Sequence, residues 1–259
     1  MTDEKCRVLE HVDVGGGYRR LVLNAPNIVS NVEAGQFVHV RVPGLDESSL
    51  RRPFSVFNAQ DDRLFLLYKE VGRGTRVLGL VKEGDEVMVL GPLGHGFPLE
   101  CKGAALLVGG GYGVAPLYLL ARSLLARNVG PVKLFAGGRS QADLLAIDAF
   151  RELGVEVFLA TNDGSVGEKG LVTLPLDAEI AKLKGASQDF EIFACGPDPM
   201  LKAVAERALS ANAKGWISMD RHMICGVGAC YACIQKTVRG NSRCCIEGPV
   251  FAAGDLVWE

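Results

Sequence analysis

The N-terminal part of the chain consists of short apolar or alternating runs separated by turn residues. Runs of this kind, bounded by glycine, proline, asparagine and aspartate, are typical of β-strands. They predict strands at Arg19–Leu23, Phe37–Val42, Phe54–Asn58, Leu64–Tyr68 and Glu86–Leu90. One or two helical turns are predicted over Thr75–Val81. Strands at this spacing indicate a closed antiparallel barrel or a sandwich, and we expect residues 1–98 to form this β-domain.

After Pro98 the apolar runs alternate with segments of helical periodicity. Strands are predicted at Ala104–Val108, Val132–Ala136, Val155–Ala160 and Glu191–Ala194. Helices are predicted at Pro116–Arg127, Asp143–Leu153 and Pro199–Ala211. Strands that alternate with helices indicate a parallel sheet covered on both faces. The pattern therefore predicts an α/β domain at residues 99–213, followed at residues 214–259 by a loop-rich module with many glycines and cysteines.

The composition is that of an ordinary globular protein. Of 259 residues, 48% are hydrophobic and 22% are charged. A net charge of −2 without a basic run gives no support for nucleic-acid binding. The longest apolar stretch, Ala104–Leu125, is interrupted by glycines, Pro116 and Arg122, so no membrane span is predicted. The segment Met1–Cys6 shows no apolar signal sequence, and we expect a cytoplasmic protein with reduced thiols.

Cysteines near the C-terminus give the strongest chemical signal. Cys225, Cys230 and Cys233 follow the pattern C-x4-C-x2-C, with further cysteines downstream, which is the spacing of plant-type [2Fe–2S] sites. A loop that wraps a cluster closely needs residues with little side-chain bulk, and the residues between these cysteines include Gly226, Gly228, Ala229 and Ala232. The motif therefore indicates one-electron transfer.

Other uses of these cysteines fit the spacing less well. Structural zinc usually takes two short ligand pairs, whereas only His222 stands beside the cysteine triplet. A disulfide framework is typical of much shorter secreted chains. The fourth ligand is Cys244 or Cys245. Because adjacent residues of an extended segment point in opposite directions, only one of them can face the cluster.

Two segments of the predicted β-domain contain residues suited to a nucleotide. Arg52 at the start of a strand can pair with a pyrophosphate, and Ser55 can hydrogen-bond a ring. In Leu67–Thr75 the end of a strand is followed by Gly72 and Gly74, whose backbone N–H groups suit an anionic phosphate. Each segment is equally compatible with a structural role, as an arginine at a strand start or a plain strand-to-helix turn.

The α/β domain contains two segments at the ends of predicted strands. Gly109–Pro116 follows the first strand directly; it does not match G-x-G-x-x-G in any register, but its strand–turn–helix context is that of a nucleotide site. Tight packing alone is the alternative. Cys195–Asp198 follows the last predicted strand. Because ligands lie outside the carboxyl ends of parallel strands, we expect both segments to face the same crevice.

These motifs, in this order, resemble the ferredoxin–NADP reductase superfamily. The resemblance rests on Arg52–Ser55, Gly74–Thr75, Gly91–Gly94, Gly109–Pro116 and Cys195–Pro197. That superfamily has an FAD-binding β-barrel followed by a nicotinamide-binding α/β domain. The cysteine motif and the closing segment Cys245–Phe251 narrow the resemblance to the family of electron-transfer subunits of class 1B dihydroorotate dehydrogenases, over essentially the whole chain.

The resemblance implies three cofactors, which are FAD, NAD and a [2Fe–2S] cluster. The residues that would hold FAD are Arg52, Pro53, Phe54, Ser55, Leu67, Tyr68, Lys69, Gly74 and Thr75. Those that would receive NAD(H) are Gly109, Gly110, Gly111, Gly113, Cys195, Gly196 and Pro197. The final cysteine of the family stands two residues before Gly-Pro-Val-Phe, so the metal ligands would be Cys225, Cys230, Cys233 and Cys245. Superfamily members often have tyrosine in place of Phe54, so one hydroxyl donor is absent here.

The implied function is electron transfer between NAD(H), FAD and the cluster. The cluster would exchange electrons with FMN in a separate catalytic subunit, which oxidises dihydroorotate to orotate in pyrimidine biosynthesis. Hydride transfer between nicotinamide and flavin needs stacking and not an acid–base pair, so no catalytic residue is predicted. A (β/α)8 domain of about 250 residues would occupy the whole chain. The family therefore implies a hetero-oligomer, expected to be a heterotetramer.

Two other functions remain open. A subunit of an NADH-dependent ferredoxin:NADP oxidoreductase or of a sulfide dehydrogenase would share the flavin and cluster modules. In such a protein Arg139, in the turn after the second α/β strand, could bind a 2′-phosphate, although a solvent-exposed arginine and NAD are expected. A non-enzymatic redox sensor would keep the cluster and lack the flavin.

Overall fold

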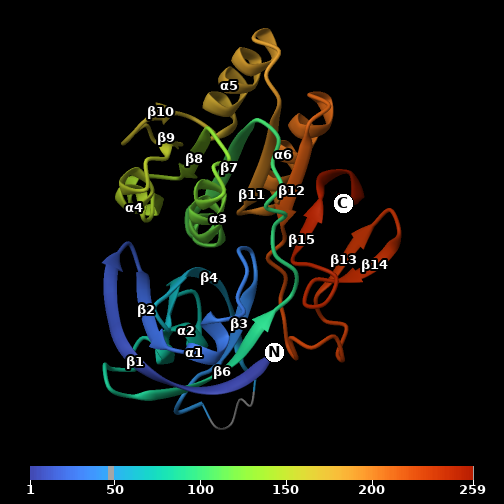
Figure 1. Ribbon diagram of the computed structural model, residues 1–259. Helices are drawn as coiled ribbons and strands as arrows, with labels where there is room; N and C mark the ends of the chain where they lie inside the picture. Colours follow the sequence, from blue (N-terminus) through green and yellow to red (C-terminus); the bar gives the residue numbers. More distant parts are fainter. Residues whose placement is uncertain (46–49, 259) are drawn as a thin grey trace.

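The structure is a computed structural model that describes residues 1–45 and 50–258. Its N-terminal part is a closed antiparallel barrel with the strand order β1-β2-β5-β4-β3-β6 (Figure 1). The short helices α1 (Pro26–Val29) and α2 (Arg73–Leu78) lie in its connections. The predicted barrel is therefore confirmed. Its strands are β1 (Thr2–Gly15), β2 (Tyr18–Asn24), β3 (Phe37–Arg41), β4 (Arg52–Gln60), β5 (Arg63–Lys69) and β6 (Glu86–Leu93).

The long first strand, β1, was not predicted because its buried face is partly polar. Glu4, Cys6 and Val8 alternate as its buried residues, with charged residues between them. The Glu4 carboxylate accepts the backbone N–H groups of Asn27 at 3.3 Å and Ile28 at 3.0 Å, at the start of α1. Because Glu4 is buried to accept these N–H groups, the strand lacks the apolar alternation by which a strand is predicted from sequence.

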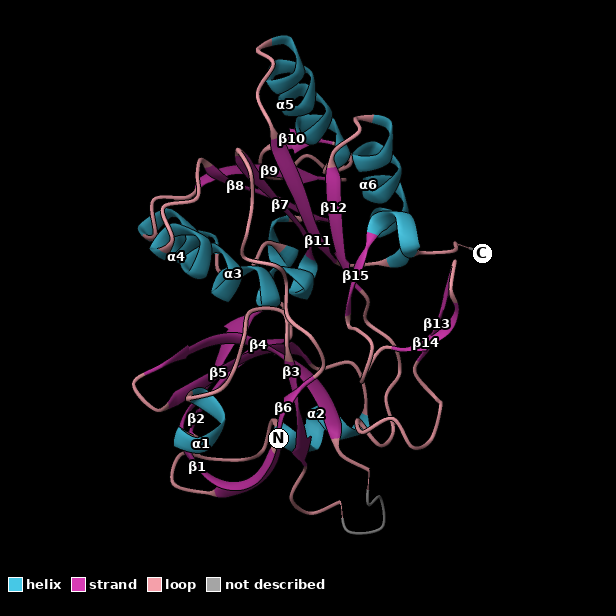
Figure 2. Ribbon diagram, turned by 45° about the vertical axis from the view of Figure 1, so that its right-hand side comes forward, coloured by secondary structure: helices cyan, strands magenta, loops and turns pink. Residues whose placement is uncertain are grey.

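The second part of the chain is a largely parallel sheet with the strand order β10-β9-β8-β7-β11-β12-β15 (Figure 2). Within this sheet β15 pairs antiparallel with β12, and the other described pairings are parallel. The predicted parallel sheet is confirmed. Its strands are β7 (Ala104–Gly110), β8 (Val132–Gly138), β9 (Glu156–Thr161), β10 (Glu168–Lys169), β11 (Phe190–Cys195), β12 (Lys214–Ser218) and β15 (Val250–Ala252).

Helices cover both faces of this sheet because its central strands are apolar on both sides. Alternate residues of β7 divide between two cores: Leu107 packs in the core shared with α3 and the barrel, and Leu106 in the core shared with α5 and α6. The helical segments are η1 (Gly111–Val114), α3 (Ala115–Ala126), η2 (Gln141–Asp143), α4 (Ile147–Glu152), α5 (Thr173–Gly185) and α6 (Asp198–Ser210).

The helix predicted at Asp143–Leu153 was wrong in its first part. Residues 144–146 are not helical, and α4 begins only at Ile147. Ala146, which precedes it, has a left-handed backbone with φ of 55°. Helix α5 was not predicted: Pro175 lies in its first turn, where proline is tolerated, and the buried Glu179 breaks its apolar pattern.

The C-terminal segment leaves the sheet at the end of β12 and returns to it as β15. Between these strands lie the cysteine loop and a hairpin of β13 (Ile234–Thr237) and β14 (Gly240–Arg243), and η3 (Ala253–Asp255) follows β15. Figure 1 shows this segment in red beside both the barrel and the sheet. Neither β12 nor β15 was predicted, because each is short and β12 contains a glycine.

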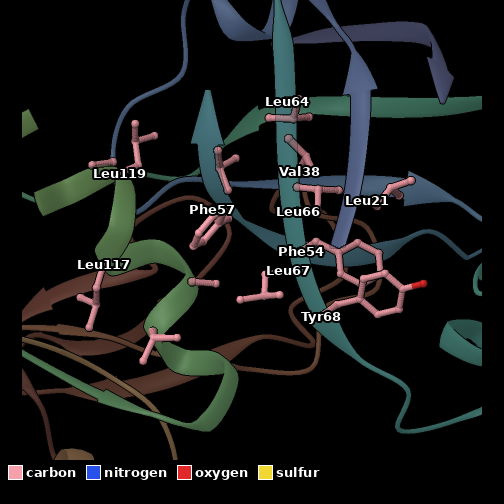
Figure 3. Close-up of a cluster of buried hydrophobic side chains, with 14 of the residues drawn as sticks. Leu21, Val38, Phe54, Phe57, Leu64, Leu66, Leu67, Tyr68, Leu117 and Leu119 are labelled. Carbon is pink, nitrogen blue, oxygen red and sulfur yellow. The ribbon is translucent and has the colours of Figure 1, made fainter. Parts of the chain in front are cut away.

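The barrel and the α/β part pack directly on each other. Phe57 of β4 stacks on Tyr118 of α3, with ring centroids 4.5 Å apart and an angle of 18° between the planes. Leu117 and Leu119 of α3 belong to the same apolar cluster as the barrel residues shown in Figure 3. Tyr18 of β2 adds a polar link, since its hydroxyl donates to Asp143 Oδ1 at 2.9 Å.

Among the helices that the structure describes, none has the length and apolar character required to cross a membrane.

The α/β core contains a buried ion pair, and a second, exposed lysine near the same carboxylate provides a control. Lys133 of β8 lies 3.0 Å from Glu179 of α5, and both side chains are nearly inaccessible. We expect Lys133→Met to lower the free energy of unfolding by about 3–5 kcal/mol, because it removes the buried cation that pairs with the buried Glu179 carboxylate. Lys182→Met, which removes the exposed partner 3.9 Å from the same carboxylate, should cost less than about 1 kcal/mol. Urea unfolding of the three proteins tests this, and equal losses would contradict it.

Candidate functional site

A cleft opens where the barrel, the parallel sheet and the beginning of the C-terminal segment meet. It encloses a cavity volume of about 230 Å³. The barrel side of the cleft is formed by Phe37, Arg52, Pro53, Phe54, Ser55, Leu67, Tyr68, Lys69, Val71 and Thr75. The opposite side is formed by Tyr112, Gly113, Ala115, Cys195, Ser218, Met219, Asp220, Met223 and Pro249. Almost all residues predicted to hold FAD and two of those predicted to receive NAD(H) therefore line one cleft.

Two aromatic side chains form the floor of the barrel side. The rings of Phe54 and Tyr68 lie 5.2 Å apart with 59° between their planes (Figure 3). The Tyr68 hydroxyl lies 2.9 Å from His11 Nε2, and His11 Nδ1 lies 2.8 Å from the carbonyl oxygen of Val81. Because that carbonyl can only accept, Nδ1 carries the proton and Nε2 accepts from Tyr68. Burial lowers the pKa of His11, so the ring stays neutral. Its unprotonated Nε2 can then accept the hydrogen bond that holds the Tyr68 hydroxyl in place.

Arg52 crosses the start of α2 at the edge of the cleft. Its guanidinium lies so close to Gly74 that a Cβ there would stand 2.5 Å from Nε. Thr75 holds the preceding turn, because its Oγ1 accepts the N–H groups of Val71 at 2.9 Å and Gly72 at 3.1 Å. Glycine at position 74 is therefore required for the arginine to reach this place. A fixed cation beside a helix start suits a phosphate group.

Lys69, at the barrel side of the cleft, links the barrel to the α/β domain. Its Nζ lies 3.1 Å from the Tyr18 hydroxyl and 3.4 Å from Asp143 Oδ1. Asp143 Oδ2 also accepts the backbone N–H of Arg139 at 3.1 Å. Hydrogen bonds from Tyr18, Arg139 and Lys69 outweigh burial and lower the pKa of Asp143. The carboxylate is thus charged and ties the turn after β8 to the barrel.

The glycine turn after β7 packs against the turn after β11. A Cβ on Gly113 would stand 2.3 Å from the carbonyl oxygen of Cys195, and one on Gly110 would stand 2.8 Å from Pro197. A Cβ on Gly196 would stand 3.0 Å from the backbone nitrogen of Gly110. The two predicted segments therefore face the same crevice, as expected. Close packing accounts for these glycines by itself.

The other predicted glycines of this turn lie outside the cleft lining. A Cβ on Gly109 would stand 2.5 Å from the side chain of Val114, which follows it in the same turn. Gly111 has a left-handed backbone with φ of +55° and lies beside the Tyr18 hydroxyl. Both glycines shape the turn without forming part of the cleft surface.

Cys195 is held as a thiol in the cleft. Burial raises its pKa to about 12, and the nearby Asp220 acts in the same direction. The side chain is only 6% exposed. A thiol with this pKa is neither a nucleophile nor a proton carrier at neutral pH.

Asp220 and Tyr112 were not singled out in the sequence. The Tyr112 hydroxyl donates to Asp220 Oδ2 at 3.1 Å across the cleft. Although solvent reaches Asp220, the protein around it raises the pKa of its carboxyl through desolvation. Asp220 follows β12 almost directly, so it stands at the carboxyl end of a parallel strand. Recognition of β12 in the sequence would have identified it as a cleft residue.

The cysteine loop has a backbone that bends repeatedly into the left-handed region. Gly226 has φ of +69° and Gly228 has φ of +78°. Tyr231, which is not a glycine, has φ of 56°. Alternation of right- and left-handed residues points successive backbone N–H groups to one side and creates an anion-binding concavity. The small residues noted in the sequence serve this shape.

The sulfur of Cys225 occupies that concavity. The N–H of Val227 lies 3.5 Å from Cys225 Sγ, and those of Cys230 and Ala229 also point to it. Burial opposes ionisation, but these N–H groups and the Cys230 side chain lower the pKa of the Cys225 thiol to about 7. Iron–sulfur clusters are bound by thiolates that accept backbone N–H groups. The donor chemistry of this loop therefore fits an iron–sulfur cluster.

The four predicted ligands lie as two contacting pairs. Cys225 pairs with Cys230, and the Cys245 thiol pairs with Cys233 and is approached by the N–H of Gly228. Among residues 1–45 and 50–258, no three or more cysteine, histidine or acidic side chains converge on one metal-ion position. Cys244 and Cys245 are both buried, and burial raises the pKa of each thiol to about 12, so these properties do not distinguish them. The contact between Cys245 and Cys233 favours Cys245 as the fourth ligand, which stays a prediction.

The barrel, the sheet and the cleft between them define an oxidoreductase of the ferredoxin–NADP reductase class. Two family models match separate parts of the chain. "Oxidoreductase NAD-binding domain" matches residues 107–206. "Iron-sulfur cluster binding domain of dihydroorotate dehydrogenase B" matches residues 220–257, which contain all of the predicted ligand cysteines.

Relatives of similar length narrow this class further. The chain is 40% identical over 263 residues to "Dihydroorotate dehydrogenase B (NAD(+)), electron transfer subunit" of Shouchella clausii (strain KSM-K16), covering 98% of this chain and 97% of that protein. It is 40% identical over 245 residues to the protein of the same name from Geobacillus thermodenitrificans (strain NG80-2), covering 92% and 91%. The chain belongs to the family of electron transfer subunits of dihydroorotate dehydrogenase B.

Solved structures show the same architecture. The structure of an NADH-dependent reduced ferredoxin-NADP oxidoreductase, described in connection with flavin-based electron bifurcation, matches with a TM-score of 0.85 and 30% identity, over 98% of this chain and 90% of that chain. A ferredoxin NADP+ reductase from Neisseria gonorrhoeae with bound FAD and NADP matches with a TM-score of 0.66 and 17% identity, over 86% and 96%. The second match supports the fold alone.

The contact between the two turns can be tested at Gly113. Gly113→Ala forces apart the backbones of the glycine turn and of Cys195, because its Cβ would overlap a carbonyl oxygen. We expect a loss of about 1–3 kcal/mol in stability from this overpacking, and a weaker affinity for NADH. Gly185→Ala at the end of α5, where nothing lies within 4 Å, should be neutral or slightly stabilising. Thermal unfolding and NADH titration measure both effects, and a neutral Gly113→Ala would argue against the close contact.

Proposed function

We propose that this chain carries electrons between NAD(H) and the FMN of a separate dihydroorotate dehydrogenase catalytic subunit, through FAD and a [2Fe–2S] cluster. The observation that carries the proposal is the shared cleft. Its surface combines the barrel strand ends, the turn at Gly113 and Cys195, and the segment from Ser218 to Met223. The chain continues from Met223 directly into the loop that begins at Cys225. The three proposed cofactor sites therefore adjoin one another.

The barrel side of the cleft is proposed to hold FAD. Arg52, with the turn at Gly74 and Thr75, offers a cation and backbone N–H groups for the pyrophosphate. Phe54 and Tyr68 offer apolar surface to the isoalloxazine ring, and Ser55 offers a hydroxyl. The remaining FAD contacts are proposed for Pro53, Leu67 and Lys69.

The opposite side of the cleft is proposed to receive NAD(H). Gly113 and Cys195 present small surfaces at the carboxyl ends of β7 and β11, where a nicotinamide ring could approach the flavin face. The supporting contacts are proposed for Gly109, Gly110, Gly111, Gly196 and Pro197. Arg139 is exposed in the turn after β8, and we propose NAD rather than NADP as the nucleotide.

The cluster ligands are proposed to be Cys225, Cys230, Cys233 and Cys245. The backbone N–H groups around Cys225 support this set, since they stabilise a thiolate. Bound FAD would supply the exchange between electron pairs and single electrons, and a bound cluster would supply a one-electron carrier. The contribution of the chain is to hold the reacting groups in contact and to keep the buried thiol of Cys195 neutral.

The surface around the cysteine loop supports a protein partner. Val227, Tyr231 and Ile246 are 40%, 63% and 39% exposed, and Ile224 lies at the loop entry with 44% exposed. Large apolar side chains gathered at one surface are typical of an interaction site. We propose that the FMN-containing subunit binds here, and that two copies of each subunit form a heterotetramer.

We propose the cytoplasm as the compartment of this protein. All eight cysteines of the chain are free thiols, and cluster ligands must remain reduced. We also propose that the chain divides into an FAD domain (1–98), an NAD domain (99–213) and a cluster module (214–259). The first boundary falls between β6 and β7 and the second between α6 and β12. The third unit is anchored to the second, because β12 and β15 belong to its sheet.

A second candidate function follows from the solved structure with the TM-score of 0.85. That protein is an NADH-dependent reduced ferredoxin-NADP oxidoreductase, and its likeness covers 98% of this chain. A role in such an enzyme, or in a sulfide dehydrogenase, would use the same three sites with a different partner.

The proposed phosphate contact can be tested with two neighbouring arginines. Arg51 makes a two-pronged ion pair with Asp3 on the surface, whereas Arg52 lines the cleft. We expect Arg52→Gln to weaken FAD binding by about 10- to 100-fold, which corresponds to losing a charge-assisted hydrogen bond of about 1.5–3 kcal/mol. Arg51→Gln should retain its FAD. Flavin absorbance per mole of purified protein and FAD titration of stripped protein measure this, and equal retention in both variants would refute it.

The proposed partner can be tested by reconstitution. We expect the chain, combined with an FMN-containing dihydroorotate dehydrogenase catalytic subunit, to support reduction of NAD by dihydroorotate, and to prefer NADH over NADPH in the reverse direction. Activity with ferredoxin and no response to dihydroorotate would favour the second candidate function. A clear preference for NADPH would overturn the choice of nucleotide.

A further inference from the structure

His39 lies at the junction between the barrel and the cysteine loop. It belongs to β3, where the strand register pairs it with Pro53 of the cleft wall. Its side chain is completely buried beside Phe37, with ring centroids 5.6 Å apart. The end of the imidazole that carries both nitrogens lies against Gly226. A Cβ on Gly226 would stand 2.7 Å from Cε1, 2.9 Å from Nδ1 and 3.0 Å from Nε2.

Both ring nitrogens of His39 lack a hydrogen-bond partner among the residues that the structure describes. Burial, with a smaller effect of Arg51, lowers the pKa of His39 to about 4. The ring is therefore neutral and has one N–H donor. Buried donors in native proteins are nearly always paired, because an unpaired one costs free energy. We therefore expect a bound group to accept a hydrogen bond from this N–H.

The acceptor must come from the loop side of His39. The ring lies beneath Gly226, the residue next to Cys225 in the loop proposed to bind the cluster. The ring also packs against Phe37, whose side chain offers no hydrogen-bond acceptor. Sulfur atoms of a bound cluster are hydrogen-bond acceptors and carry negative charge.

We propose that the N–H of His39 donates a hydrogen bond to a sulfur of the iron–sulfur site, either a bridging sulfide or the Cys225 thiolate, and so raises the reduction potential of the cluster. This rests on the cluster binding proposed above. Reduction adds negative charge to the cluster, and a hydrogen bond to its sulfur is stronger in the more negative state. His39 thus tunes the cluster from the flavin side of the barrel and is not one of its ligands.

The first test is a redox titration of the purified holoprotein, monitored by electron paramagnetic resonance. His39→Leu removes the donor and keeps an apolar side chain of similar size, and His39→Gln restores an N–H donor. We expect His39→Leu to shift the equilibrium of electron transfer from flavin to cluster about tenfold toward the flavin, which equals about 59 mV for one electron. His39→Gln should recover part of this shift. The FAD potential of the same protein is the internal reference.

The second test starts from the wild-type protein. In wild-type protein labelled with nitrogen-15 histidine, pulsed electron paramagnetic resonance of the reduced cluster should show a weak magnetic coupling to a histidine nitrogen. The matched control is His222→Gln, because His222 stands three residues before Cys225 in the sequence. The coupling should persist in this control and disappear in His39→Leu.

The outcomes separate this proposal from the proposed function. Full cluster content without a histidine coupling in the wild type overturns the role of His39, whatever the variants do. An unchanged cluster potential in His39→Leu overturns it as well. A coupling that is lost in the His222→Gln control would assign the donor to His222 instead. Purified protein without iron and acid-labile sulfide would contradict the proposed function, and the role of His39 with it.

Discussion

The antiparallel pairing of β15 with β12 is the interaction on which the arrangement of the cofactor sites depends. Ser218 and Val250 are paired at the base of the C-terminal segment, and the N–H of Met219 donates to Pro249 at 2.9 Å. The N–H of His95 donates to Gly248 at 2.6 Å, so the same base is fastened to the barrel side. The segment between β12 and β15 is therefore attached at its base to both the sheet and the barrel side. These attachments keep the cysteine loop beside the cleft.

The protein environment of the cleft suppresses proton chemistry and favours contact between stacked rings. Burial raises the pKa of Cys195 and lowers that of His11, so both are neutral at physiological pH. The charged groups nearby, such as Asp143 and Lys69, are engaged with each other across the junction between barrel and sheet. Close backbone contacts shape the side of the cleft proposed for the nicotinamide, and Phe54, Tyr68 and Arg52 shape the side proposed for the flavin.

The sequence predicted those features whose signal is local. Alternating apolar runs identified the barrel strands after β1, and the cysteine spacing identified the loop. It failed where polar residues are buried for tertiary reasons, as at Glu4 in β1 and Glu179 in α5. Asp220 was missed because its position depends on β12, a short strand that is stabilised only by its neighbours in the sheet. His39 gave no signal, because its contact with Gly226 joins residues far apart in the chain.

The apolar side chains exposed around the cysteine loop also affect how the isolated chain behaves in solution. Val227, Tyr231 and Ile246 are exposed to solvent in the isolated chain, in the same segment as the free thiols of the cysteine loop. Exposed apolar side chains favour aggregation, and accessible thiols react with oxidants and metals. If the proposed partner covers this surface, the isolated chain will be the form most exposed to both reactions.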